Sequence, residues 1–99
     1  MRLKISDVAK KDMRDIKEYL DTKLAIDAYY NLKATIDKKL DLIESLPNSG
    51  TVVKFKGLEN IRWVLAGSYY IFYTVSSDVV EVRTIIHTAR NYKRLLSKI

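Results

Sequence analysis

The chain has 99 residues, with 18 Lys and Arg against 12 Asp and Glu, a formal net charge of +6, and no cysteine. This length predicts a single domain spanning residues 1–99, because chains divide into several domains only well beyond it, and the lack of cysteine excludes disulfides, thiolate metal sites and cysteine nucleophiles. No apolar run is long enough to span a membrane, and the N-terminus lacks the apolar core of a signal peptide, so we expect a cytoplasmic protein.

The first half of the chain has the apolar periodicity of one strand and two helices. Residues 2–6 alternate apolar and polar side chains, which predicts a short strand, and Ser6 or Asp7 can cap the helix that follows. Apolar residues then recur every three or four positions up to Leu20, and again from about residue 24 to residue 46. Because so few residues separate the two segments, we expect an antiparallel helical hairpin.

The second half changes to the pattern of β-strands. Residues 61–67, 69–75 and 79–86 are rich in β-branched and aromatic residues, and breaks of turn length separate them. This pattern predicts an antiparallel meander. The segment 51–60 has two interpretations, an extended arm or an additional edge strand, and residues 89–98 can form a final helical turn or two.

The resulting order, β-α-α-β-β-β with a short C-terminal helix possible, predicts an α+β domain. A helical hairpin cannot bury two apolar stripes by itself. We therefore expect it to pack on one face of an antiparallel sheet, and we expect the other face to be open to a partner.

Most of the excess positive charge lies near the C-terminus. After Glu81 the chain carries five Lys and Arg residues and its only histidine, His87, but no acid. Such a patch attracts polyanions, whether RNA, DNA or an acidic protein. With three glycines there is no P-loop or dinucleotide fingerprint, and one histidine without cysteine makes a metal site not credible. We expect no cofactor.

The strand pattern predicts where these cations lie. Residues of like parity in a strand share a face, so Arg83, Ile85 and His87 are predicted to point together away from the helices. Arg62, on the first meander strand, joins them if the register allows it. Arginines suit phosphate oxygens, and a histidine can transfer a proton near neutral pH, so this surface could cleave RNA. A solvated basic surface that binds an acidic partner has the same composition.

Taken in order, the strand, the helical hairpin and three stretches of sequence resemble a known family. The stretches are "LIESLPNSG", "IRWVLAGSYYIFYTV" and "VEVRTIIHTARNY". Over nearly the whole chain, they resemble the RelE/ParE superfamily of bacterial type II toxin–antitoxin toxins, also known as plasmid stabilisation proteins. The resemblance implies a toxin that arrests growth and is neutralised by a cognate antitoxin, which we expect to be acidic.

The superfamily divides by mechanism, and the resemblance implies candidate residues for one branch. RelE-like members are mRNA interferases, endoribonucleases that cleave mRNA on the ribosome, whereas ParE-like members inhibit DNA gyrase and lack a nuclease site. The sequence favours the nuclease, with gyrase inhibition as the alternative and a non-toxic binding module as a third. The nuclease hypothesis assigns catalysis to Arg62, Arg83, His87, Arg90 and Tyr92, and RNA binding to Lys93 and Arg94. The long second helix and "LPNSG" look like the ParE branch.

Overall fold

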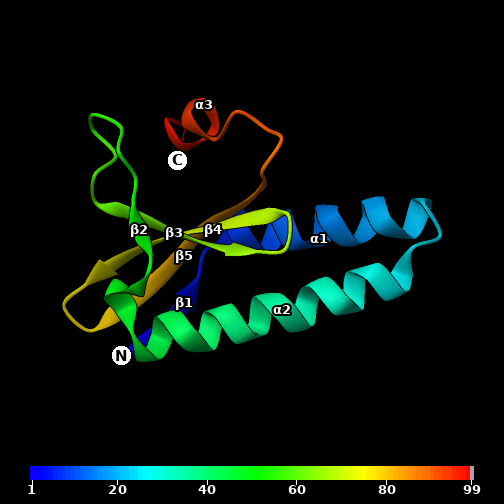
Figure 1. Cartoon of the computed structure of the whole chain (residues 1–99), viewed down its shortest axis with the longest axis horizontal. Coiled ribbons are helices and arrows are strands. Elements are labelled where there is room, and N and C mark those ends of the chain that lie inside the picture. The colour runs from blue at the N-terminus through cyan, green and yellow to red at the C-terminus, as the bar shows by residue number, and fades with distance from the viewer. Residues whose placement is uncertain (99) are drawn as a thin grey trace.

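The computed structural model describes residues 1–98, and its elements follow the predicted order (Figure 1). The helices are α1 (Asp7–Thr22), α2 (Ile26–Ser45), the 3-10 turn η1 (Pro47–Ser49) and α3 (Tyr92–Leu96). The strands are β1 (Arg2–Ile5), β2 (Thr51–Val52), β3 (Ile61–Ala66), β4 (Tyr69–Ser76) and β5 (Val79–His87). The predicted α+β fold is confirmed, and the ambiguous segment 51–60 is a two-residue edge strand followed by an irregular arm.

The five strands form one sheet in the order β1-β5-β4-β3-β2. Strands β2 to β5 pair antiparallel with their neighbours, as the short turns require. Strand β1 pairs parallel with β5, so the sheet is mixed, whereas the sequence predicted an antiparallel one. No turn joins β1 to β5, because the whole intervening chain separates them, and turn signals therefore could not set their relative direction.

The helical hairpin lies along one face of the sheet and extends beyond the ends of its strands (Figure 1). Helix α1 is capped by Ser6, whose Oγ accepts a hydrogen bond from the Ala9 N–H at 3.1 Å, as predicted. Among the described residues, no helix is both long and apolar enough to cross a membrane. The hairpin and the sheet enclose the main core, whose most buried members are Ala9, Ile36, Ile43, Ala66, Ile71, Tyr73, Val80 and Val82.

Helix α1 also completes the edge of β5 beyond the point where β1 ends. The Ser6 N–H donates to the Val82 carbonyl at 2.9 Å, and the Ser6 hydroxyl donates to the Arg83 carbonyl at 2.8 Å. One turn further along, Asp12 Oδ2 accepts from the Thr84 hydroxyl at 2.5 Å and from the Ile85 N–H at 2.9 Å. These contacts satisfy backbone groups that would otherwise be unpaired at a sheet edge, and they hold α1 against β5.

A β-bulge in β5 changes which side chains face the hairpin. Phe72 of β4 pairs with Thr84, but the next residue of β4, Tyr73, pairs with Val82, so Arg83 has no partner. The extra residue resets the alternation of the strand. Before the bulge Val82 belongs to the main core, and after it Ile85 does. The predicted common face of Arg83, Ile85 and His87 is therefore wrong.

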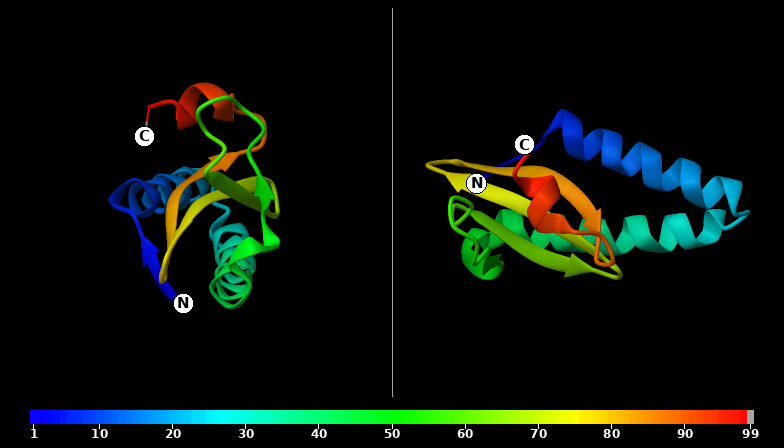
Figure 2. Two further views of the ribbon diagram at one scale, coloured as in Figure 1. Left: turned by 90° about the vertical axis from the view of Figure 1, so that its left-hand side faces the viewer. Right: turned by 90° about the horizontal axis from the view of Figure 1, so that it is seen from above.

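The second face of the sheet is partly covered, whereas the sequence predicted that it would be open. Figure 2 shows α3 and the arm 53–60 on the side of the sheet opposite the hairpin. Asn91 caps α3 by accepting a hydrogen bond from the Arg94 N–H at 3.3 Å. Beneath α3 and the arm lies a second, smaller core, whose buried members are Val53, Ile61, Phe72, Ile86 and Leu96.

Candidate functional site

Arg62 lies on the hairpin side of the sheet. It is opposite Tyr73 in the pairing of β3 with β4, and Tyr73 belongs to the main core. The Arg62 guanidinium donates to two backbone carbonyls of the loop after α2, those of Gly50 at 2.9 Å and Asn48 at 3.3 Å. In this position Arg62 fixes the loop to the sheet.

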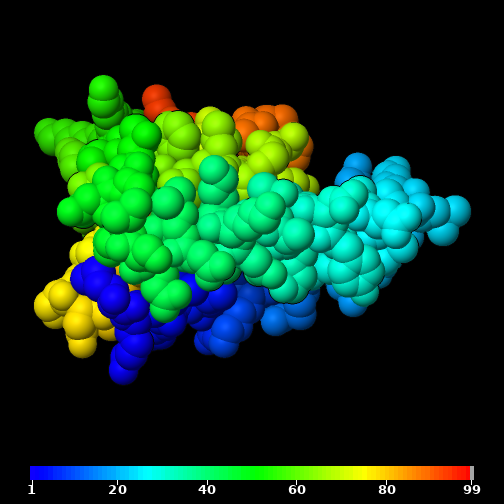
Figure 3. Space-filling view, turned by 60° about the horizontal axis from the view of Figure 1, so that its bottom comes forward, coloured from blue at the N-terminus to red at the C-terminus, as the bar shows by residue number. Residues whose placement is uncertain are grey.

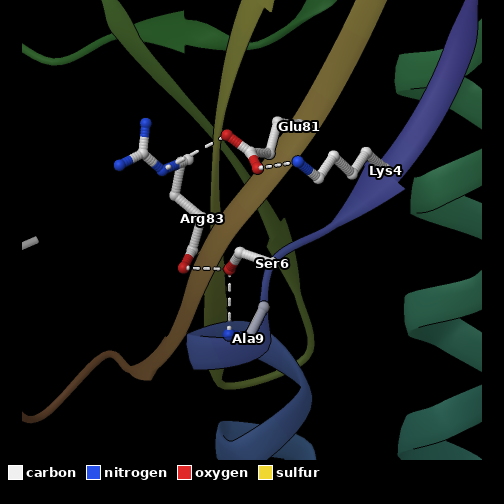
Figure 4. Close-up of polar contacts among 5 residues, drawn as sticks. All are labelled: Lys4, Ser6, Ala9, Glu81 and Arg83. Carbon is white, nitrogen blue, oxygen red and sulfur yellow. Dashed lines mark hydrogen bonds and ion pairs between the residues drawn. The ribbon is translucent and has the colours of Figure 1, made fainter.

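Arg83 lies on the opposite face, beside the cation Lys4. Its Nε is 3.7 Å from Glu81 Oε1, and Lys4 Nζ is 3.6 Å from the other oxygen of the same carboxylate. Figure 4 shows this row of alternating charges running across β1 and β5. About a third of the Arg83 side chain is exposed, so it can still contact a ligand on this face.

His87 returns to the hairpin side, because the bulge precedes it. Its ring contacts that of Tyr69 edge to face, with centroids 5.0 Å apart. Its Nδ1 accepts a hydrogen bond from the Ala89 N–H at 3.0 Å, so the proton of the neutral ring lies on Nε2. His87 can therefore act as a hydrogen-bond donor toward the hairpin.

The four remaining candidates lie in the C-terminal segment. Arg90 is exposed in the loop before α3. Tyr92 packs its ring against Tyr70 and Phe72, with centroids 5.3 Å and 5.5 Å away, and so anchors α3 to the sheet. Arg90 and Arg94 line a groove of about 310 Å³ along α3, together with Asn91, Leu95 and Lys98.

The predicted single cationic surface does not form. Arg62 and His87 lie on the hairpin side of the sheet, whereas Arg83 lies on the opposite side. Arg90 lies in the loop between them. Two pairs of candidates are brought together: Arg90 with Arg94 in the groove along α3, and His87 with Arg90 in a second groove at the end of the sheet. The bulge in β5 separates Arg83 from His87, whereas Arg62 is separated from Arg83 because the register of β3 places it on the hairpin side.

The structure adds a basic surface that the sequence reasoning missed. The arm carries Lys54 and Lys56 on either side of an exposed ring, Phe55, and Lys93 Nζ lies 5.5 Å from the centroid of that ring. We call this region, with Arg94 and Lys98, the arm–α3 surface. Cations interleaved with an exposed aromatic ring are typical of surfaces that bind single-stranded nucleic acid. The tripeptide "KFK" at 54–56 was the signal that could have revealed it.

A second feature is a groove where α1 passes the end of the sheet, which we call the corner groove. Its volume is about 650 Å³. It is lined by Asp12, Asp15, Ile16, Tyr19 and Leu20 of α1 and by Ser68, Tyr69, Ile85, His87 and Arg90. Burial raises the pKa of the Tyr69 phenol above its ordinary value, and the nearby Tyr19 phenol raises it further. Two members of the predicted basic C-terminal cluster, His87 and Arg90, thus open onto a mixed apolar and polar groove.

Within residues 1–98, no three His, Cys, Asp or Glu side chains gather closely enough to hold a metal ion. A domain with a helical hairpin on one face of a small mixed sheet, and a basic arm and C-terminal helix on the other, has the architecture of the small toxins of bacterial toxin–antitoxin systems.

Comparison of the sequence with family models makes this specific. Residues 3–92 match the family described as "ParE toxin of type II toxin-antitoxin system, parDE", and the chain belongs to that family. This confirms the predicted membership of the RelE/ParE superfamily. A search of curated proteins finds no match.

Two solved structures have a similar fold. The first, from the chromosomal ParDE toxin–antitoxin system of P. aeruginosa, aligns with a TM-score of 0.73 at 13% identity and covers 88% of this chain and 95% of that one. The second is from the RelB–RelE antitoxin–toxin complex of Methanococcus jannaschii. It aligns with a TM-score of 0.51 at 19% identity and covers 97% of this chain and 98% of that one. At such identities the likeness concerns the fold alone.

Proposed function

We propose that this chain is the toxin of a type II toxin–antitoxin pair, and that it arrests growth in the cytoplasm by binding DNA gyrase without cleaving RNA. The observation that carries the proposal is the separation of the candidate residues. Cleavage through the 2′-hydroxyl needs a base, an acid and phosphate-binding cations around one phosphate. Arg62 is engaged with the Gly50 and Asn48 carbonyls on one face, and Arg83 is on the other. This arrangement supports a binding role.

Membership of the ParE family supports the same choice of target, because ParE-like members of the superfamily inhibit gyrase. The structural neighbours come from systems or complexes that contain an antitoxin. An antitoxin partner for this chain is therefore part of the proposal. The formal charge of +6 favours an acidic one.

The direct test is a supercoiling assay with purified gyrase and relaxed plasmid. The expected result is inhibition that saturates near one toxin per gyrase site, since the toxin acts by binding. A parallel reaction on ribosomes programmed with mRNA should leave the message intact. Normal supercoiling at excess toxin would overturn the proposal.

The second candidate is ribosome-dependent mRNA cleavage, and the arm–α3 surface is the observation that favours it. Here Arg83 and Arg90 would hold phosphates, Lys93 and Arg94 would bind the RNA strand, and His87 or Tyr92 would transfer the proton. Cleavage of the message on programmed ribosomes, lost in Arg90→Ala and retained in Arg14→Ala on the exposed side of α1, is the result that would select this candidate.

The third possibility, a binding module without toxicity, is tested by induced expression. Growth arrest that is relieved by co-expression of an antitoxin is the expected result. Undiminished growth at high expression would favour the non-toxic module.

A further inference from the structure

The turn that joins α1 to α2 has the two hydrogen bonds of a Schellman motif. The Ala25 N–H donates to the Leu20 carbonyl at 2.9 Å. The Leu24 N–H donates to the Asp21 carbonyl at 3.0 Å. The motif requires a left-handed residue after the C-cap, and Leu24 has a φ of 55°. Glycine is the usual residue there because a Cβ is unfavourable in this conformation, so the backbone of the turn gives no reason for a leucine.

The packing of the chain gives no reason for Leu24 either. Its side chain is 95% exposed, so it buries almost no area against the rest of the molecule. Figure 3 shows the end of the hairpin, where this turn lies, projecting past the other elements. Leu24 is thus unfavourable for its own backbone and exposed to water, and contact with another molecule would account for both properties.

Other exposed apolar side chains lie close to Leu24 in the sequence. Tyr19 and Tyr30 are each 58% exposed, and Ile26 is 37% exposed. Ile26 and Tyr30 are four residues apart on α2, so they lie on one face of that helix. We call the region formed by Tyr19, Leu24, Ile26 and Tyr30 the hairpin tip. Exposed apolar groups gathered at one projecting end are typical of a surface that contacts another protein.

The end of the hairpin is acidic, although the chain is basic. Residues 18–31 contain one lysine and three acids, Glu18, Asp21 and Asp27, which gives a local net charge of −2 against +6 for the whole chain. Within residues 1–98, none of the three acids makes an ion pair within 4.0 Å. These charges disfavour a nucleic acid or an acidic protein as the occupant. They favour a protein surface with cations around an apolar recess.

We propose that the hairpin tip is the surface through which this chain docks on its protein target, with Leu24 inserted into an apolar recess whose rim carries Lys or Arg. In the proposed function that target is gyrase, so the identity of the partner rests on that function. Burial of Leu24 supplies affinity, because almost all of this side chain is exposed before binding. The turn fixes the position of the side chain in advance, which reduces the entropic cost of docking.

A second copy of this chain is the other occupant whose charge would fit, since its arm–α3 surface is basic. That surface presents an exposed ring, Phe55, between two lysines, and a projecting ring is a poor receptor for a projecting leucine. The proposal therefore commits to the target protein, and self-association is measured as an outcome of the test.

The test measures the binding of the full chain to purified gyrase, together with growth arrest on induced expression. Leu24→Asn preserves the turn, because Asn also adopts the left-handed conformation, but it removes the apolar contact. It should weaken binding at least about tenfold without lowering the midpoint of urea denaturation. Leu24→Met retains an apolar side chain and should bind within about threefold of the wild type. The matched control is Leu46→Asn, because Leu46 is 59% exposed at the opposite end of α2, and it should bind as the wild type does.

A second pair of variants tests the charge of the tip. Asp21→Lys should weaken binding at least about threefold at low ionic strength and less at high ionic strength. Asp21 lies in the last turn of α1, where a lysine is favourable to the helix dipole, so unfolding would not explain the loss. Asp41→Lys, at an exposed position near the other end of α2, should bind as the wild type does.

Equal binding by Leu24→Asn and Leu46→Asn would overturn the proposal, as would a dimer of the wild type that Leu24→Asn dissociates in sedimentation equilibrium. If the wild type and Leu24→Asn inhibit gyrase equally, the proposed function stands and the docking role of the tip fails. If gyrase is unaffected but growth arrest still requires Leu24, gyrase is the wrong target and the tip remains the docking surface.

Discussion

A single phenol, that of Tyr73, ties the end of the hairpin to the sheet. Its hydroxyl donates to the Pro47 carbonyl at 2.7 Å and accepts from the Gly50 N–H at 2.8 Å, and the side chain is fully buried. A Cβ at Gly50 would lie 2.8 Å from Cε1 of this ring, so the loop can approach only as glycine. Arg62 holds the same loop through the Gly50 carbonyl. Arg62, which the nuclease hypothesis assigned to catalysis, thus has a structural role.

The first prediction is that Tyr73→Phe destabilises the protein despite the small change in shape. The substitution leaves the Gly50 N–H and the Pro47 carbonyl without their partner, and such a loss costs about 1–3 kcal/mol. Urea denaturation measures it. The control is Tyr92→Phe, because the Tyr92 hydroxyl makes no hydrogen bond within residues 1–98. Equal midpoints for the two variants would show that the Tyr73 hydroxyl has no such role.

At the scale of elements, the contact of α1 with β5 is polar at the sheet edge and apolar beneath it. Asp12 substitutes for the missing strand by accepting from the Ile85 N–H. Asp15, about one turn later on the same helix, is exposed and paired only with Lys11. Two aspartates so close in sequence therefore differ in what they stabilise.

The second prediction follows from that difference. Asp12→Ala should destabilise by about 1–3 kcal/mol, because it leaves a backbone donor unpaired at a buried edge. Asp15→Ala should change the stability by less than about 0.5 kcal/mol, as is usual for exposed ion pairs. The gain in helix propensity is the same for both substitutions and cancels in the comparison. Chemical denaturation measures the free energy of unfolding of both variants. A larger loss of stability for Asp15→Ala than for Asp12→Ala would contradict the prediction.

The elements show which parts of the fold can be predicted from sequence. The hairpin could be predicted because apolar residues recur every three or four positions through two long helices, so that many residues carry the same signal. The bulge at Arg83 could not be predicted, because nothing in "VVEVRTIIH" marks it. This single extra residue moves the side chain of every later residue of β5 to the other face of the sheet. The corner groove combines α1 with the ends of β4 and β5, so it depended on a register that only the structure gives.

At the scale of the whole molecule, the charge is unevenly distributed. On α2, Lys33 is paired with Asp37, whereas in the arm–α3 surface Lys93 lies over the ring of Phe55, which Lys54 and Lys56 flank in the sequence. A polyanion that binds this surface releases condensed counterions in proportion to the phosphates that it contacts.

The third prediction is that a single-stranded RNA oligonucleotide binds the arm–α3 surface with an affinity that falls steeply as salt rises. The double substitution Lys54→Glu with Lys56→Glu should flatten the dependence on log salt by about 1.4, because each phosphate contact to a single strand contributes about 0.7. Lys38→Glu, an exposed position on α2, should leave it unchanged. Fluorescence anisotropy over a salt series measures the slopes, and parallel slopes for all three proteins would rule out this surface.

The sheet lies between two cores of unequal size, and α3 depends entirely on the smaller one. A helix of five residues has no stability of its own in water. It is held by the fully buried Leu96 and by Tyr92. Because Phe72 of the small core and Ile71 of the main core are neighbours on β4, the two cores share a strand and should unfold together.

The fourth prediction tests this coupling. Leu96→Ala should cost about 2–5 kcal/mol, the usual loss for a large buried side chain, whereas Leu95→Ala, at a half-buried position, should cost less. The single tryptophan, Trp63, packs against the small core and reports on it by fluorescence, while far-ultraviolet circular dichroism reports mainly on the hairpin. In a urea titration of Leu96→Ala both signals should shift to the same lower midpoint. An early fluorescence transition with unchanged circular dichroism would instead mean that α3 and the arm separate from a sheet that stays folded.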